Sequence, residues 1–220
     1  MKKMVFFAIC LLVAGSVSAQ GYYRGPHRVK HAPERRRVGD FYKVRAGITG
    51  GVNIANTVNA YNDNYSTGTI AGFNAGFTLD VPLIYPLSFE PEALFSQKGY
   101  SANTTDGHFT QRSNYIDVPL LAKLKLGPNF NFLIGPQLSF PISTTQTYDN
   151  GFSVVARQYY DTRSYNTILD GVVGVSFDLS PNVELRARYT IDLQQNAQNS
   201  DYGPDYRNQV WQIGLGIKFE

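Results

Sequence analysis

The alternation of apolar and polar residues is clearest between residues 113 and 143. From Ile116 to Leu126 every second residue is apolar. The positions between them carry the charged residues Asp117, Lys123 and Lys125. After a Gly-Pro-Asn sequence at 127–129 the alternation resumes. A period of two predicts β-strands, and two strands joined by a short turn predict a hairpin. Long strands with one apolar face are typical of a transmembrane β-hairpin.

The same pattern recurs along the chain and predicts eight strands. They lie near 42–54, 70–81, 87–100, 113–126, 130–143, 165–179, 183–195 and 208–219. The long polar connections are 55–69, 101–112, 144–164 and 196–207, and the short proline-containing ones are 82–86, 127–129 and 180–182. This arrangement predicts an all-β protein, an eight-stranded antiparallel up-and-down transmembrane β-barrel with both termini in the periplasm.

The charges within the predicted strands lie on the face opposite the apolar side chains. Because Lys or Arg facing lipid at the bilayer midplane costs roughly 2–4 kcal/mol, we expect every one of them to point into the barrel. The predicted lumen set is Lys43, Arg45, Asp80, Glu90, Glu92, Lys98, Asp117, Lys123, Lys125, Asp170, Asp178, Glu184, Arg186, Arg188, Asp192 and Lys218. Basic and acidic residues balance in this set. Because so narrow a barrel is filled by its own side chains, the sequence predicts a structural ion-pair network that plugs the lumen.

Prolines and glycines within the predicted strands indicate local irregularities in the ladders and space in the lumen. Prolines in strands without a free edge predict bulges or gaps in the hydrogen-bond ladder. They are Pro91, Pro119, Pro136 and Pro141. Small residues on the polar face are expected to make room for long lumen side chains. They include Gly72, Gly76, Gly135, Gly174, Gly214 and Gly216.

One segment is similar to a known family. Tyr115–Lys123 reads Tyr-Ile-Asp-Val-Pro-Leu-Leu-Ala-Lys, and Gly135 and Pro136 follow in the next predicted strand. These residues resemble the porin-family outer-membrane β-barrel domain of the Bacteroidota, a group that includes PorT-like barrels linked to type IX secretion. The resemblance covers residues 41–220 and implies an eight-stranded barrel. Because that family is functionally mixed, it implies no single mechanism.

The first forty residues have no strand pattern. Residues 1–19 combine a basic start, an apolar core and a small-residue site before Gln20, which predicts a signal peptide cleaved between Ala19 and Gln20. The one cysteine, Cys10, lies in this segment, so we expect a mature protein without thiols or disulfides. Residues 20–40 are strongly basic and predict a flexible periplasmic tail, either a solvated linker or an arm for anionic lipid or an acidic periplasmic partner.

Candidate catalytic residues are sparse. Histidine occurs at His27, His31 and His108, and only His108, beside Thr104, Thr105 and Asp106, imitates part of a hydrolase site. Positioned base and orienting groups are not recognisable there. The chain has no zinc, Walker or dinucleotide motif and no calcium-loop spacing among its aspartates. We therefore expect no enzymatic activity, no cofactor and no metal.

The function expected from these features is that of a monomeric barrel in outer-membrane lipid and lipopolysaccharide. It would act as a structural or interaction barrel, or as an accessory of an envelope or type IX secretion complex with a periplasmic or envelope protein as partner. Tyrosines in the last two long loops suggest contact surface, and nucleic acid is not an expected partner. The main alternative is a narrow porin-like diffusion channel. A lipid-modifying enzyme and a soluble lipocalin-like carrier are less favoured, because the first lacks a catalytic constellation and the second needs an apolar interior.

Overall fold

The computed structural model describes residues 42–59, 67–104, 107–149, 154–163, 166–193 and 206–219, so the predicted signal peptide and basic tail lie outside the described residues. The strands are β1 Arg45–Asn59, β2 Thr67–Gly68, β3 Ile70–Ile84, β4 Leu87–Thr104, β5 Gly107–Lys125, β6 Phe130–Asp149, β7 Val154–Asp161, β8 Ile168–Asp178, β9 Val183–Asp192 and β10 Tyr206–Phe219. Within these ranges there is no helix of the length and apolarity needed to span a membrane.

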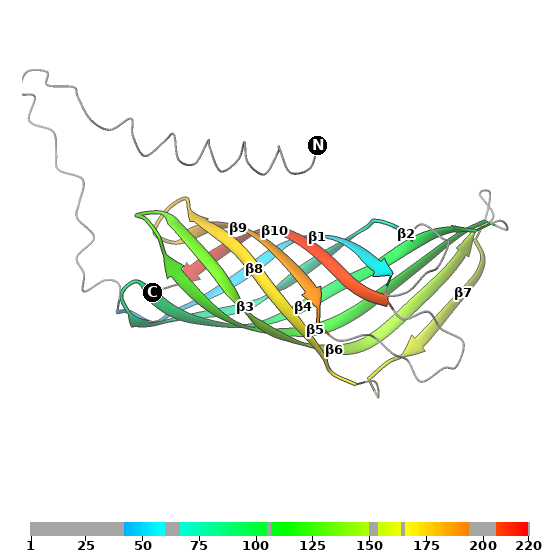
Figure 1. Cartoon of the computed structure of the whole chain (residues 1–220), viewed down its shortest axis with the longest axis horizontal. Helices are drawn as coiled ribbons and strands as arrows, with labels where there is room; N and C mark the ends of the chain where they lie inside the picture. The colour runs from blue at the N-terminus through cyan, green and yellow to red at the C-terminus, as the bar shows by residue number, and fades with distance from the viewer. Residues whose placement is uncertain are drawn as a thin grey trace, which may run out of the picture. The chain divides into compact units, whose positions relative to one another are not determined.

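Eight of the strands close into an antiparallel ring (Figure 1). The order around the ring is β1, β3, β4, β5, β6, β8, β9 and β10, and β10 pairs back to β1 with Phe219 opposite Ala46. The β4–β5 ladder closes the ring on the other side. The predicted eight-stranded antiparallel barrel is therefore confirmed, and it is up-and-down because the order around the ring is the order of the strands in the sequence.

Side chains alternate between an apolar outer face and a polar interior. On β5, Ile116 and Leu120 are exposed, whereas Asp117 and Lys123 between and beyond them are buried. On β6 the outward apolar positions run from Phe130 to Phe140, about 25 Å along the axis of a barrel with tilted strands. That height is typical of the apolar band of a membrane-spanning barrel.

Several strands reach further than the sequence predicts, and β7 is an additional strand. The segments 101–112 and 144–164 were expected as loops, and this expectation is wrong: they contain the end of β4, the start of β5, the end of β6 and all of β7. Part of 55–69 likewise belongs to β1 and β2. Figure 1 shows β4, β5, β6 and β7 projecting beyond the ends of β1, β9 and β10. We call this extension the projecting sheet. Within the described residues, β7 pairs with β6 alone.

The four strand prolines lie at interruptions of the ladders, as predicted. The β4–β5 register stops at Pro91 opposite Leu120 and resumes at Leu94 opposite Asp117. The β5–β6 register is interrupted next to Pro119 and Pro136, and it shifts where Tyr115 faces Pro141. A missing N–H removes one ladder hydrogen bond, so the strands separate or bulge locally.

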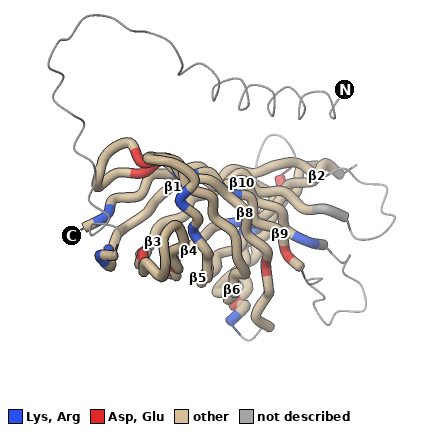
Figure 2. Tube along the Cα trace, turned by 60° about the vertical axis from the view of Figure 1, so that its left-hand side comes forward, with Lys and Arg blue, Asp and Glu red and all other residues tan. Residues whose placement is uncertain are grey.

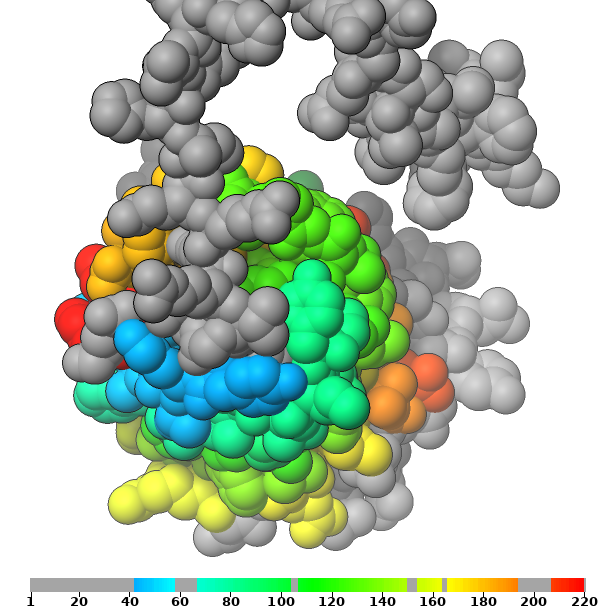
Figure 3. All heavy atoms as spheres, turned by 90° about the vertical axis from the view of Figure 1, so that its left-hand side faces the viewer, coloured from blue at the N-terminus to red at the C-terminus, as the bar shows by residue number. Residues whose placement is uncertain are grey.

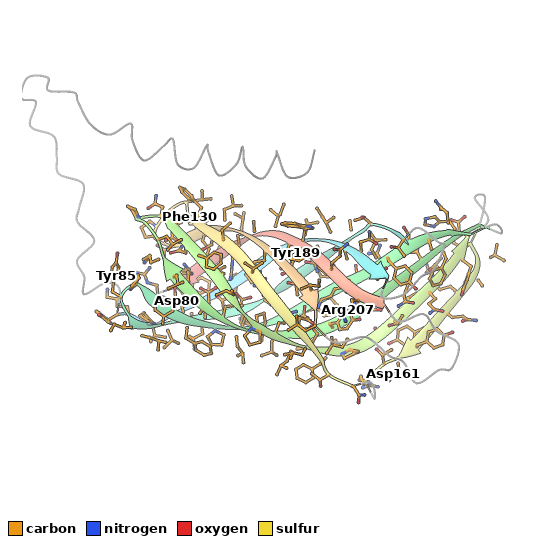
Figure 4. The ribbon with its side chains drawn as sticks, viewed as in Figure 1. Asp80, Tyr85, Phe130, Asp161, Tyr189 and Arg207 are labelled. Atoms are coloured by element: carbon orange, nitrogen blue, oxygen red, sulfur yellow. The ribbon has the colours of Figure 1, made fainter. Side chains whose placement is uncertain are left out.

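The short turns lie together at one end of the ring. Figure 4 shows Tyr85 and Phe130 at this end and Asp161 far from it. Seen from the same end, the start of β1 and the β3–β4 turn lie side by side (Figure 3), which agrees with the pairing of Arg45 with Asp80. We call this the turn end of the barrel.

Candidate functional site

The interior of the barrel holds a dense set of charged side chains that six strands supply. Figure 2 marks where the charged residues lie along the backbone. Strict alternation turns them inward, opposite the apolar outer positions. Most of them form one group toward the turn end, which we call the lower cluster. Its members are Asp80, Glu90, Glu92, Lys123, Asp178, Glu184, Arg186, Arg188 and Lys218.

Two arginines of β9 in the lower cluster reach across the lumen. Arg186 Nη2 lies 2.5 Å from Glu90 Oε1 and also bonds Glu92. Arg188 Nη1 donates to Glu92 Oε2 at 2.6 Å. In the ring order, three strands separate β4 from β9 on either side, so these two strands form opposite walls. The guanidinium–carboxylate bridges therefore span the full width of the interior.

Two lysines complete the lower cluster. Lys123 Nζ lies 2.6 Å from Glu90, 3.1 Å from Glu184 and 3.4 Å from Asp80. Lys218 Nζ lies 2.6 Å from the same glutamate of β9 and 3.5 Å from Asp178. Each glutamate of this cluster thus contacts at least two cations. Such sharing offsets the desolvation cost of burying the charges.

A separate upper cluster surrounds Lys98, which is 2% exposed. Its Nζ lies 3.0 Å from Asp117 Oδ2 and 3.4 Å from Asp170 Oδ2. Ser139 Oγ is 2.6 Å from a carboxylate oxygen of each aspartate, and Gln137 Nε2 donates to Asp170 at 2.7 Å. The ammonium also lies 4.8 Å from the centre of the Tyr115 ring, a cation–π distance. Here one cation serves two fully buried carboxylates.

An uncharged network in the upper half of the lumen is absent from the sequence prediction. Asn53 Oδ1 accepts from Asn74 Nδ2 at 2.5 Å and from Gln212 Nε2 at 3.1 Å, while its own amide donates to Ser96 Oγ at 3.0 Å. Neutral amides give no charge signal, and only their place on the inward parity could have singled them out. They fill the interior with paired polar groups.

The sixteen predicted lumen residues do not all lie in the two clusters. Lys43 is exposed and precedes the first residue of β1, which contradicts its assignment to the lumen. Outside a ladder, alternation no longer fixes the direction of a side chain. Arg45 and Lys125 are half-buried at strand ends near the turns. Asp192 is buried opposite Asp170, and it accepts from the backbone N–H and the side-chain amide of Asn208, both at 2.9 Å.

Charged side chains also lie on the outward face of the projecting sheet, where the sequence predicted no site residues. Arg112 lies in a segment expected as a loop, and its Nη1 donates to Gln97 Oε1 at 2.7 Å. Gln97 in turn donates to Asn114, which donates to Ser143, each at 3.0 Å. The signal that could have found them is the continuation of the outward parity of β5 beyond Ile116.

The candidate catalytic residues are not assembled into a site in the described part of the chain. His108 Nδ1 lies 3.4 Å from Thr110 Oγ1 in an exposed position. Its neighbours Thr105 and Asp106 lie outside the described residues, as do His27 and His31. Among the described residues, no three His, Cys, Asp or Glu side chains are grouped so that they could hold a metal ion.

A closed strand ring with an apolar outer band and an ion-paired interior defines an integral β-barrel membrane protein. The family model described as "Outer membrane protein beta-barrel domain" matches residues 34–220. The chain belongs to this family, and the protein is accordingly an outer-membrane β-barrel protein. A comparison with curated protein sequences gives no match.

Solved structures of similar proteins include two bacterial surface barrels. Neisserial surface protein A is 18% identical, with 79% of this chain and 97% of that chain covered at a TM-score of 0.49. Ail, the attachment invasion locus protein of Yersinia pestis, is 14% identical, with 80% of this chain and 98% of that chain covered at a TM-score of 0.46.

Proposed function

We propose that the protein is a non-enzymatic, non-conducting barrel that anchors a binding surface at the outer membrane. The observation that carries this proposal is the bridging of opposite walls: Arg186 and Arg188 of β9 are ion-paired with glutamates of β4. These groups are at most 4% exposed, and this burial argues against a continuous water path beside them. An ion crossing the lumen would have to break several buried charge pairs at once.

The binding surface is the projecting sheet. In the orientation that we propose, the turn end and both termini face the periplasm, so β4–β7 extend outside the cell. Their inward face carries an aromatic cluster, with ring centres 4.9 Å apart for Phe109 and Tyr148 and 5.9 Å apart for Tyr100 and Phe109. Val154, Val155 and Tyr159 on β7 are more than half exposed. Exposed apolar and aromatic residues on a strand with a single described neighbour support contact with a protein partner.

A role as an accessory of an envelope or type IX secretion complex is the most specific form of this proposal. It rests on the resemblance of Tyr115–Lys123 to PorT-like barrels, and the basic segment 20–40 would supply a periplasmic contact. The barrel itself would act as a monomer. Crosslinking in intact cells followed by purification, with the full chain compared with a deletion of residues 20–40, tests this form. Loss of a specific envelope protein on deletion supports it, and an unchanged set of crosslinked proteins contradicts it.

Orientation and conductance test the proposal directly. The variant Tyr159→Cys should react with a membrane-impermeant maleimide on whole cells. The variant Leu126→Cys, near the turn end, should react only after the outer membrane is permeabilised. In planar bilayers the parent barrel should show no steady conductance, and Arg186→Ala or Arg188→Ala should introduce small-ion leakage or lower stability. A steady conductance of the parent would favour the porin-like channel instead. A lipid A mass spectrum that changes on deletion of the gene would favour an enzyme.

A further inference from the structure

We propose that the outward face of β4–β7, immediately beyond the apolar band, binds the phosphorylated sugar headgroup of an outer-leaflet glycolipid, lipid A. The phosphate would be held by Arg112 and Arg157, and neighbouring amides and hydroxyls would serve the sugar. This deepens the proposed function, because it rests on the same orientation of the barrel.

The surface consists of three rows of side chains that cross the four strands. Register places Gln97, Asn114, Ser143 and Asp161 in the first row; Gly99, Arg112, Thr145 and Tyr159 in the second; and Ser101, Thr110, Thr147 and Arg157 in the third. These residues continue the outward parity of Ile116 on β5. We call this surface the polar patch. Apart from the Tyr159 ring, it is composed of hydrogen-bonding or charged side chains and one glycine.

The polar patch begins where the lipid-facing band ends. Ile116 and Phe140 are paired across β5 and β6 and are 39% and 41% exposed. Asn114 is the next outward residue of β5, and Arg112 follows it. Four residues of a tilted strand place the Arg112 backbone about 10 Å beyond Ile116 along the barrel axis. The headgroup layer adjoins the hydrocarbon at this distance.

The arginines of the polar patch differ from those of the lumen in their partners. Arg186 and Arg188 are held by glutamates, and Arg163, at the edge of the patch, is paired with Asp161 at 2.5 Å. Neither Arg112 nor Arg157 has a carboxylate at ion-pair distance in the described part of the chain, and the hydrogen bond of Arg112 goes to a neutral amide. These cations therefore face the outer leaflet without an internal counter-ion.

A chain of hydrogen bonds joins side chains of the first two rows of the patch. Arg112 donates to Gln97, Gln97 to Asn114, and Asn114 to Ser143, which is 5% exposed and ends the chain. Arg112 retains four of its five N–H donors. Two strand spacings and one row separate Arg112 from Arg157, about 12 Å between backbones. Long side chains can converge over that span on one phosphorylated headgroup, and the threonine hydroxyls between them suit sugar hydroxyls.

The charge and the donor pattern favour a glycolipid over a phospholipid. A phospholipid phosphate would use the arginines but leave most of the hydroxyl and amide groups without ligand partners. A phosphorylated sugar matches both kinds of group, and guanidinium–phosphate contacts are among the strongest charge-assisted hydrogen bonds.

The experiment titrates the mature barrel, refolded in a neutral detergent, with diphosphorylated lipid A and counts bound lipid by native mass spectrometry. We expect saturable binding that weakens about tenfold, or about 1.4 kcal/mol, for Arg112→Gln and again for Arg157→Gln, because each change removes charged hydrogen bonds to the phosphate. Lys43→Gln changes the net charge equally at the opposite end and should leave binding unaltered. Gel mobility before and after heating shows that each variant is folded.

Any one of four outcomes would overturn the proposal. Three of them are equal binding of dephosphorylated lipid A, equal binding of phosphatidylglycerol, and weakening by Lys43→Gln as large as that by Arg112→Gln. A double variant Arg112→Gln/Arg157→Gln that binds like the parent would also overturn it. The titration depends neither on conductance nor on orientation in cells, so its failure is distinguishable from failure of the proposed function.

Discussion

Replacement of Lys98 by methionine tests how the two lumen clusters differ. Lys98 is the only cation that contacts Asp117 or Asp170 among the described residues, and both aspartates are 0% exposed. Methionine keeps most of the side-chain volume, so the change removes charge and little packing. Breaking a buried ion pair from one side costs about 3–5 kcal/mol, because an uncompensated charge stays behind. Here two carboxylates lose their counter-ion.

Lys123→Met is the matched comparison, and its expected cost is smaller although Lys123 contacts three carboxylates. Glu90 keeps Arg186 at 2.5 Å, and Glu184 keeps Lys218 at 2.6 Å. Asp80 is 17% exposed and is reached by water. No carboxylate is left both buried and without a cation. The loss is then that of charged hydrogen bonds, about 1.5–3 kcal/mol.

The measurement is urea-induced unfolding of the barrel refolded in lipid vesicles, followed by fluorescence of the single tryptophan, Trp211. Lys98→Met should lower the free energy of unfolding more than Lys123→Met. Adding Asp117→Asn and Asp170→Asn to Lys98→Met should recover most of the loss, since neutral amides need no counter-ion. An equal or larger loss for Lys123→Met, or no recovery in the triple variant, would refute the two-cluster description.

Three further predictions concern other parts of the barrel. Phe77 and Tyr159 are similarly exposed, at 70% and 68%, but Phe77 lies on the ring and Tyr159 on the projecting sheet. In the same urea titration, Phe77→Arg should lower the free energy of unfolding by about 2–4 kcal/mol, because the new charge faces lipid. Tyr159→Arg should change that free energy by less than about 0.5 kcal/mol. A Cβ at Gly216 would lie 3.0 Å from Glu184 Cγ and Oε1. Gly216→Val should therefore displace that carboxylate and lower the free energy of unfolding by about 1–3 kcal/mol. Gly127→Ala is the control and should leave stability unchanged, because a Cβ there has no neighbour within 4 Å. Hydrogen bonds from the Arg163 side chain and backbone lower the pKa of Asp161 from 3.8 to about 2. The pair is therefore fully formed above pH 3.8 and is lost as the pH falls through about 2. In the variant Arg163→Gln, an NMR titration should show the pKa of Asp161 shifted back toward its ordinary value.

The ring could be predicted from the sequence because lipid imposes a strict rule on every second residue. Wherever one face meets hydrocarbon, alternation is unmistakable, as on β5 from Ile116 to Leu126. The rule ends where the hydrocarbon ends. Beyond Asn114 both faces of the strands are mixed in polarity, so the period-two signal disappears although the ladder continues. For this reason the sequence predicted loops where the projecting sheet lies. The outward position of Arg112 on a strand was therefore not predicted.

The sequence predicts which residues face the lumen better than it predicts which of them form ion pairs. Parity shows that Glu92 and Arg188 face inward, but it does not show that they meet across the barrel. That contact depends on the stagger of β4 relative to β9, which is set around the whole ring. A slip of two residues in one ladder would preserve parity and change the partners. The error at Lys43 has a different origin: the residue lies before the first ladder pair of β1, where alternation does not fix the direction of a side chain.

The seam between β1 and β10 has a consequence for how the protein matures. Ala46 faces Phe219, so the cylinder is sealed by contacts between its first and last strands, which are far apart in the sequence. Joining such distant partners carries a large loop-closure entropy and is intrinsically slow. A nascent chain that lacks its final strand retains two open edges, and it must be kept from pairing with its neighbours until translation is complete. Assembly of this barrel is therefore necessarily post-translational, and a chain truncated before the last strand cannot seal.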